Sequence, residues 1–301
     1  MHLFYAIIRE SFSTENAFRF FASQMSNLTR FIQAPFDRVL KFAGIVAFVV
    51  WALSLVTDNY TFMDRLWPIL PAVYSWIIVD PFPPDLSDPR LVLMAAVLTF
   101  WGLRLFAYFY IKGVYNFSAY DDYRWISIKN GMSPMRFQLF NLFFIAIFQN
   151  ILLVLMILPV HYVSINRESD PLNFFDCIIC LSILLSVIGE GAADWQQWNF
   201  QQKKKKDKKL DFISTGLFRF CRHPNYFCDI MVYLLLYFFS IKNESNWINW
   251  SLVGIVVYVL VFQKSIQITE ELALKKYPRY KIYKTETWKL IPKLFWKSHQ
   301  D

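Results

Sequence analysis

Glycine is scarce in this chain, with eight residues among 301. Gly-rich phosphate-binding loops and tight β-hairpins both need glycine at fixed positions, so the shortage argues against either structure. Cysteine is scarcer still, with four residues whose spacing shows no disulfide framework. Two of them, Cys177 and Cys180, form a CxxC within an apolar run. No histidine or further cysteine pair is placed to complete a metal site there, so we expect small apolar side chains on one helix face.

Charge is low as well. Charged residues make up 18% of the chain, against 56% hydrophobic and 19% aromatic residues, and the mean hydropathy is +0.31. The 31 Phe and 11 Trp are easier to place in lipid and at its interfaces than in one water-soluble core. The net charge of +8 comes from basic residues in loops and in the C-terminal tail. We therefore expect an integral membrane protein that binds membrane lipids or an anionic cofactor, and no nucleic acid.

The N-terminal segment, residues 1–38, is not expected to be a secretory signal, because its short apolar stretch lacks a basic start. Four arginines among Ser, Thr and Phe are typical of a mitochondrial transit peptide, but three acidic residues weaken that match. We interpret this segment as an amphipathic arm that lies in the membrane interface. The remainder, residues 39–301, is predicted to be a single transmembrane domain.

Apolar runs recur along the whole of that domain. A membrane-spanning helix needs roughly 17 to 25 residues, and the runs reach this length alone or with their amphipathic flanks. The weakest run is interrupted by Pro68 and Pro71. The sequence predicts an all-α, polytopic transmembrane bundle of about seven helices. The runs are Val39–Val56, Leu66–Val79, Leu91–Ile111, Phe137–Val160, Leu172–Ile188, Tyr226–Ile241 and Trp247–Val261.

The lysine run Lys203–Lys209 is expected to be a solvated loop and to orient the bundle, because basic loops stay on the cytoplasmic side. The last two apolar runs are predicted to form a hairpin with a turn at Lys242–Asn246. The lysine run, the basic tail and the loop Lys112–Arg136 then share the cytoplasmic face. The acidic loop Asp80–Arg90 falls on the opposite face.

Ionisable side chains at the edge of an apolar span are costly and are usually functional. Glu190, Asp194 and Gln197 continue the Leu172–Ile188 run at helical spacing and are predicted to line one helix face. Such a face can hydrogen-bond ribose hydroxyls or a carboxamide. The alternative is a helix end wetted by lipid headgroups.

A second polar set surrounds Pro224. Arg219, Arg222 and His223 stand at i, i+3 and i+4, which predicts one cationic helix face suited to phosphate oxygens. Pro224 ends that helix, and Asn225, Tyr226 and Asp229 follow at the membrane edge. Positive-inside anchoring with an aromatic belt explains the arginines and the tyrosine, but not His, Pro, Asn and Asp packed together. In the tail, Glu270 is the residue that we expect to join this site.

A third set lies in the N-terminal half. Arg104 stands inside an apolar run about two turns from its end, where it either extends to the interface or pairs with a buried acid. Asp122 and Arg124 follow in the next loop. Their roles as site residues or as interface residues stay open.

The order of these motifs resembles the membrane family of steroid 5α-reductase-like proteins, in a branch whose members are mostly of unassigned function. The likeness extends from about Leu66 to Pro292. The short RHP-x-Y segment also resembles isoprenylcysteine carboxyl methyltransferases, to which the family is distantly similar. The motifs are WGLRL, DDYRW, E-x3-D-x-Q-x3-F, GLFRFCRHPNYF and S-x4-E followed by YP-x-Y-x2-Y and a proline.

The resemblance implies a cytosol-facing NADPH pocket in the C-terminal half and a lipid-like substrate that enters from the side. It implies reduction of a carbon–carbon double bond conjugated to a carbonyl, with hydride from the nicotinamide. The chain departs from the branch at Cys228-Asp229, where Gly-Glu is usual, and the proton donor stays unassigned. The residues expected to hold the cofactor are Glu190, Asp194, Gln197, Arg219, Arg222, His223, Asn225, Tyr226, Asp229 and Glu270.

Two other functions stay open at this point. One is an accessory or structural subunit of a membrane complex, for instance a mitochondrial one, that keeps the reductase-like fold. The other is an S-adenosylmethionine-dependent methyltransferase of lipids or prenylated cysteine. The expected location is the endoplasmic reticulum membrane or the mitochondrial inner membrane, and the sequence does not separate them.

Overall fold

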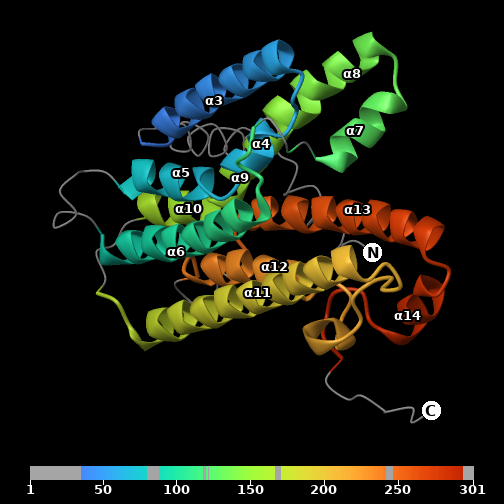
Figure 1. The fold of residues 1–301 in the computed structure, drawn as a ribbon. Helices are drawn as coiled ribbons and strands as arrows, with labels where there is room; N and C mark the ends of the chain where they lie inside the picture. Colours follow the sequence, from blue (N-terminus) through green and yellow to red (C-terminus); the bar gives the residue numbers. More distant parts are fainter. Residues whose placement is uncertain are drawn as a thin grey trace, which may run out of the picture.

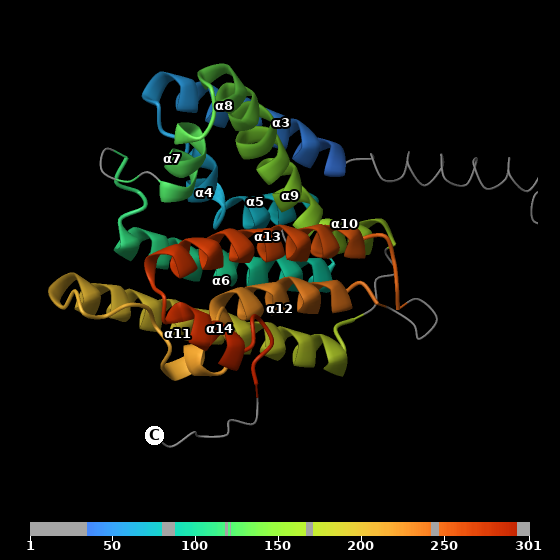
Figure 2. The same cartoon turned by 90° about the vertical axis from the view of Figure 1, so that its right-hand side faces the viewer.

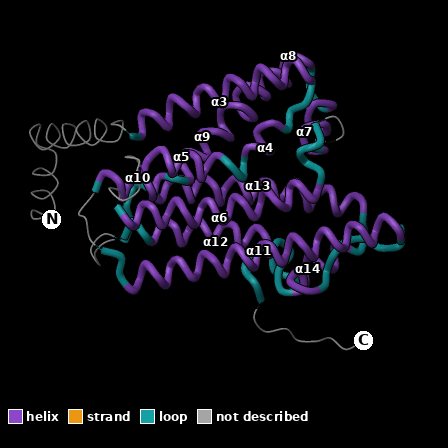
Figure 3. The backbone as a smooth tube through the Cα atoms, turned by 60° about the vertical axis from the view of Figure 1, so that its left-hand side comes forward, coloured by secondary structure: helices purple, strands orange, loops and turns teal. Residues whose placement is uncertain are grey.

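The computed structural model describes residues 35–79, 88–117, 120, 122–166, 171–241 and 247–293. Every regular element among them is a helix (Figure 3), which confirms the all-α prediction. The helices are α3 (Phe36–Thr57), α4 (Phe62–Leu66), α5 (Leu70–Val79), α6 (Pro89–Lys112), α7 (Tyr123–Asn130), α8 (Pro134–Phe140), the π-helical η2 (Asn141–Phe148), α9 (Gln149–Met156), α10 (Leu158–Ile165), α11 (Phe174–Lys206), the 3-10 turn η3 (Gly216–Arg219), α12 (Pro224–Phe238), α13 (Leu252–Lys276) and α14 (Tyr280–Glu286).

By length and composition, five helical stretches among these residues can cross a membrane: Phe36–Thr57, Pro89–Lys112, Pro134–Met156, Phe174–Lys206 and Leu252–Lys276. This differs from the seven spans that the apolar runs predict. The predicted run Leu66–Val79 is split, because a turn at Trp67–Ile69 separates α4 from the ten-residue α5. The predicted run Tyr226–Ile241 forms α12, which has 15 residues and is not among the five candidate spans.

Three predicted features fall on segments outside the description. They are most of the N-terminal arm, residues 80–87 of the acidic loop and the turn at residues 242–246. The end of the arm is described from Pro35, and Phe36–Arg38 form the first turn of α3. The division into an interfacial arm and a bundle stays a prediction, because residues 1–34 lie outside the description.

The four helices that carry the polar motifs pack side by side (Figures 1 and 2). Arg90 pairs with Asp176, and Arg104, 14 residues further on, pairs with Glu190, 14 residues after Asp176, so α6 and α11 run parallel. The beginning of α12 meets Asp194. Helix α13 returns antiparallel to α12. The C-terminal ends of α6, α11 and α13 therefore gather with the start of α12, as the predicted topology requires.

The lysine run does not form the predicted loop over its whole length. Helix α11 continues through Lys206, and only Asp207–Lys209 leave it. Lysine has a high helix propensity, and a positive charge in the last turn is favoured by the helix dipole. The run therefore lengthens the helix instead of the loop that precedes the arginine motif.

The helices are closely packed in the interior of the bundle, and apolar side chains cover its outer surface. A Cβ atom at Gly254 of α13 would overlap the backbone carbonyl of Leu155 in α9, so only glycine permits this approach. On the outer face of α3, Ile45, Phe48 and Val56 are exposed, as expected for lipid contact. The chain is an integral membrane protein by these criteria.

Candidate functional site

Three polar stripes meet in the interior of the helix layer. On α6, Trp101, Arg104 and Tyr108 follow one another at i, i+3 and i+7, and on α12 Asn225, Asp229 and Tyr233 stand at i, i+4 and i+8. Both spacings keep the side chains on one face of a helix. Glu190 and Asp194 of α11 face these stripes, as the contacts below show. We call these residues the polar stripe cluster.

Arg104 is the cation of this cluster. Its Nη2 pairs with Glu190 and its Nη1 lies 2.6 Å from Asp194 Oδ2, while both carboxylates are buried. Asn225 Nδ2 donates to the other oxygen of Asp194 at 3.2 Å. Of the two roles left open for Arg104, the structure therefore has the pair with a buried acid. One guanidinium joins α6 to α11, and one carboxylate joins α11 to α12.

Asp229 is a buried carboxylate of the cluster and has both oxygens occupied. Trp101 Nε1 donates to Oδ1 at 3.1 Å, and the Tyr258 hydroxyl donates to Oδ2 at 2.5 Å. All three residues are buried. The preceding Cys228 packs against α11, where a Cβ at Gly189 would lie 3.1 Å from the Cys228 sulfur. Cys228 thus fills space on α11, and Asp229 ties α6 to α13.

A second cluster forms around Glu270. Arg222 Nε donates to Glu270 Oε1 at 2.7 Å, and His223 Nε2 lies 3.2 Å from the same oxygen. The Nη1 of Arg222 donates to the carbonyl oxygens of Lys284 and Thr287. Arg222 and Glu270 are both buried. The structure therefore brings Arg222, His223 and Glu270 together, and their contacts fasten the tail after α13 to the start of α12.

The predicted cationic helix face around Pro224 is wrong. Residues 216–219 form a 3-10 turn and Cys221–His223 are irregular, so Arg219 and Arg222 are not on one face. Arg219 is exposed and its guanidinium carbon lies 5.1 Å from the centre of the Phe220 ring, whereas Arg222 is buried. Pro224 does not end a helix but begins α12, because it has no backbone N–H to leave unpaired there.

The outer end of the polar stripe cluster is the end where α12 begins, and its side chains are half-exposed. The Tyr226 ring stacks between His223, with centroids 5.5 Å apart, and Phe262, at 4.6 Å. Gln197 is half-exposed as a residue, but its Oε1 is buried and has no hydrogen-bond partner among the described residues. Its neighbour Gln196 instead accepts a hydrogen bond from the backbone N–H of Leu217 at 2.8 Å.

Asp122 and Arg124 belong to a third group, near α4 and outside the candidate spans. Asp122 caps α7 and holds Arg124 through two bonds of 2.9 and 2.8 Å. Arg124 Nη2 also reaches Asp64 at 3.4 Å, and Trp125 Nε1 donates to Asp64 at 2.6 Å. Burial raises the pKa of Asp64. Burial acts in the same direction on Asp122, but the bonds to Arg124 outweigh it and lower its pKa.

This third group is close enough to the polar stripe cluster to interact with it. Lys112, at the end of α6, is exposed and interacts electrostatically with Asp122, Arg124 and Asp194. Tyr226 likewise interacts with Arg124 and Asp194. Polar groups of both halves of the chain therefore converge on one end of the helix layer.

Sequence reasoning missed three members of this arrangement. Tyr233 follows Asn225 and Asp229 at the same interval of four residues, and that spacing was a usable signal. Tyr258 lies within an apolar run, and nothing in its neighbours marks it. Asp64 was missed because it is the partner of Trp125 across 61 residues of sequence.

The described residues contain no group of three or more His, Cys, Asp and Glu side chains that could hold a metal ion. Cys177 is exposed and Cys180 is half-buried on α11. The side chains described at the site carry carboxylate, amide, phenol, imidazole and guanidinium groups.

Comparisons with known proteins place the chain in a family. Residues 50–287 match the family model described as Protein of unknown function (DUF1295). The chain is also similar to the Uncharacterized protein C594.04c of Schizosaccharomyces pombe, with 32% identity over 277 residues that cover 86% of this chain and 80% of that protein. No solved structure matches the chain. The protein thus belongs to the DUF1295 family of membrane proteins.

Proposed function

We propose that the protein is a membrane-embedded, NADPH-dependent reductase of a carbon–carbon double bond in a lipid-like or steroid-like enone. The observation that carries this proposal is the polar stripe cluster itself. Arg104, Glu190 and Asp194 form a buried charged group within an apolar bundle. Charges at such depth are costly and mark functional sites in membrane proteins.

The side chains at the outer end of the cluster fit a dinucleotide. The buried Oε1 of Gln197 and the Oε2 of Glu190 accept no hydrogen bond among the described residues, so ribose hydroxyls or a carboxamide N–H₂ would satisfy them. Tyr226 presents a half-exposed ring, and Asn225 and His223 are half-exposed beside it. The exposed cations Arg219 and Lys112 suit phosphate oxygens.

Arg222 and Glu270 have a supporting role in this proposal. Their charges satisfy each other, so they support the His223–Tyr226 segment from behind. NADPH supplies hydride when it is bound. The residues of this chain bind it, orient the substrate and keep water away from the reacting bond. Substrate access from the lipid phase agrees with the apolar outer surface of the bundle.

Titration of the purified protein in lipid nanodiscs tests this function. NADPH binding is followed by nicotinamide fluorescence, with NADH and S-adenosylmethionine as comparison ligands in thermal unfolding. We expect NADPH to bind in the micromolar range and to raise the unfolding temperature more than either comparison ligand. Absence of NADPH binding at millimolar concentration removes the proposal, and stabilisation by S-adenosylmethionine alone would replace it with the methyltransferase.

One observation favours the alternative of an accessory subunit. Arg222 and Glu270 pair with each other, so in this alternative the arginine motif serves only to stabilise the fold. Stoichiometric copurification with a membrane complex, together with no response to NADPH, is the outcome that this alternative predicts.

A further inference from the structure

Tyr233 carries a buried hydroxyl without a partner. Its side chain is fully buried on α12, about 12 Å along the helix axis from Asn225, and its oxygen makes no hydrogen bond among the described residues. Two other fully buried tyrosines are satisfied: Tyr74 donates to Asn150 at 2.5 Å, and Tyr258 donates to Asp229. An unpaired buried hydroxyl costs about 1–3 kcal/mol, so its presence calls for an explanation.

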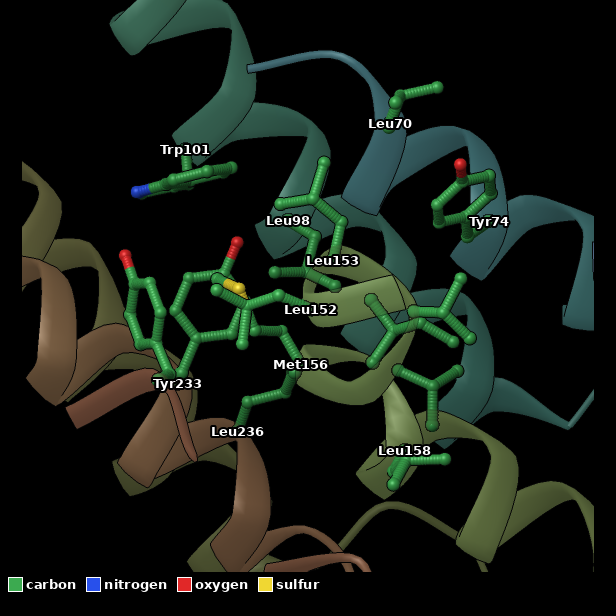
Figure 4. Close-up of a cluster of buried hydrophobic side chains, with 14 of the residues drawn as sticks. Leu70, Tyr74, Leu98, Trp101, Leu152, Leu153, Met156, Leu158, Tyr233 and Leu236 are labelled. Carbon is green, nitrogen blue, oxygen red and sulfur yellow. The ribbon is translucent and has the colours of Figure 1, made fainter. Parts of the chain in front are cut away.

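The neighbours of Tyr233 leave its hydrogen with no acceptor. Trp101 and Tyr258 meet its ring edge to face, with centroids 5.3 and 5.4 Å away, and both give their own polar hydrogen to Asp229. Figure 4 shows Tyr233 below Trp101 and close to Met156 and Leu236, which are apolar. Tyr233 is therefore a single donor without an acceptor among the described residues.

The charges near Tyr233 select the kind of acceptor. Asp229 and Glu190 both interact electrostatically with the Tyr233 hydroxyl, and both are acidic. An anionic ligand group, such as a fatty-acid carboxylate, would meet repulsion from Asp229 in a low-dielectric interior, because the hydrogen-bond donors to Asp229 are uncharged, whereas Glu190 is paired with Arg104. An uncharged oxygen meets none, and a carbonyl oxygen accepts the one hydrogen on offer.

We propose that Tyr233 donates a hydrogen bond to the carbonyl oxygen of an uncharged lipid ketone. This inference rests on the proposed function in one respect: the carbonyl is taken to be that of the enone that is reduced. A donor at that oxygen would favour addition of hydride from bound NADPH at the β-carbon, because the electron pair of the double bond then collects on the carbonyl oxygen. The α-carbon would take a proton from solvent in a separate step, which completes the reduction. Tyr233 is thus a catalytic residue that polarises the substrate, and it forms no covalent bond with it.

A pair of sterol probes tests the inference directly. Cholest-4-en-3-one and cholest-4-ene have the same ring system, but the second lacks the carbonyl oxygen. We expect the parent protein in nanodiscs to bind the ketone about fivefold more tightly than the hydrocarbon, as one neutral hydrogen bond allows. In Tyr233→Phe that preference should vanish, while the free variant unfolds at the same or a higher temperature because an unpaired hydroxyl has been removed.

Tyr74→Phe is the matched control, because it removes a hydroxyl from another fully buried tyrosine. It should unfold at a lower temperature, since Asn150 loses its partner, and should keep the preference for the ketone. If NADPH reduces the ketone, Tyr233→Phe should lower kcat about a hundredfold, the effect of losing one donor to a developing oxyanion.

The outcomes separate this inference from the proposed function. Equal affinity of the parent for both probes overturns the ketone site, and so does a preference that survives in Tyr233→Phe. If the preference depends on Tyr233 but NADPH reduces nothing, the ketone site stands and the reductase proposal falls.

Discussion

Arg222 and Glu270 form a buried ion pair that reaches across 48 residues of sequence, with Nε 2.7 Å from Oε1. The same guanidinium bonds the carbonyl oxygens of Lys284 and Thr287, and the backbone N–H of Arg222 donates to the carbonyl of Trp288 at 2.8 Å. Arg222 is therefore bonded to four residues of the C-terminal third, Glu270, Lys284, Thr287 and Trp288. The most conspicuous arginine of the motif fastens the tail to the bundle.

Replacement of this arginine should therefore act on stability. Arg222→Ala leaves Glu270 buried beside only His223 and Lys284, and we expect the free energy of unfolding to fall by about 3–5 kcal/mol. Thermal unfolding in detergent or nanodiscs measures this loss. Limited proteolysis should also cut residues 280–293 earlier than in the parent, because two carbonyl contacts of the tail are lost.

Arg219→Ala is the matched control, because this arginine is three residues away and exposed. Its unfolding temperature should fall far less than that of Arg222→Ala, whereas its affinity for NADPH should fall. An Arg222→Ala variant that is as stable as Arg219→Ala would contradict the structural role assigned to Arg222.

The sequence predicts the helical class, the convergence of one set of helix ends and most of the polar cluster, for physical reasons. Hydropathy locates long apolar helices well, and ionisable residues within them stand out because they are expensive. It does not locate α12 correctly as a span. The helix ends at Phe238. The Tyr237 hydroxyl joins this end to the segment before α13, because it donates to the carbonyl of Trp247 and accepts from the N–H of Asn249, and such contacts leave no periodic pattern.

The partner of each polar residue was harder to predict than the residue itself. Arg222 and Arg219 look equivalent in the sequence, but one is buried and the other exposed, because a 3-10 turn replaces the expected helix. Glu270 was predicted as a cofactor contact, and its charge is taken up by Arg222. A pair 48 residues apart is decided by the packing of α13 on α12, which the sequence alone does not reveal.

A second prediction concerns the contact between α9 and α13. Gly254→Ala should lower the free energy of unfolding by about 1–3 kcal/mol, because the new methyl group overlaps the backbone of Leu155. Gly44→Ala is the control: its Cβ meets nothing within 4 Å, and it lies inside α3. That variant should be unchanged or more stable by about 0.5–1 kcal/mol, as alanine is the better helix former. Equal effects of the two would show that α9 and α13 are not in close contact.

A third prediction is a pH dependence that originates at Asp64. Burial raises the pKa of Asp64 to about 6, above the usual value of about 4. Between these values the folded protein binds more protons at this carboxyl than the unfolded chain does. Its contribution to the free energy of unfolding therefore increases as the pH falls from about 6 to about 4, by up to roughly 3 kcal/mol, and is constant below that window.

Unfolding temperatures of the parent and Asp64→Asn, measured from pH 7 to pH 4, isolate this contribution. The parent should gain stability relative to the variant on acidification. Asp58→Asn serves as control, because the bond from Lys129 lowers the pKa of Asp58 and places its effect below pH 4. A parent-minus-variant difference for Asp64 that is flat across the range would refute the assignment.

The last prediction concerns Arg104, which forms ion pairs with two buried carboxylates at once. Arg104→Met should lower the free energy of unfolding by about 3–5 kcal/mol, because Glu190 and Asp194 then lose their shared cation inside the bundle. Adding Glu190→Gln and Asp194→Asn removes both orphaned charges. If the cost comes from unpaired charge, the triple variant should recover most of the lost stability, so the effects are strongly non-additive. Thermal unfolding of the single, double and triple variants measures the coupling. Additive losses would mean that Arg104 contributes through the packing of its stem, and that the carboxylates find another partner.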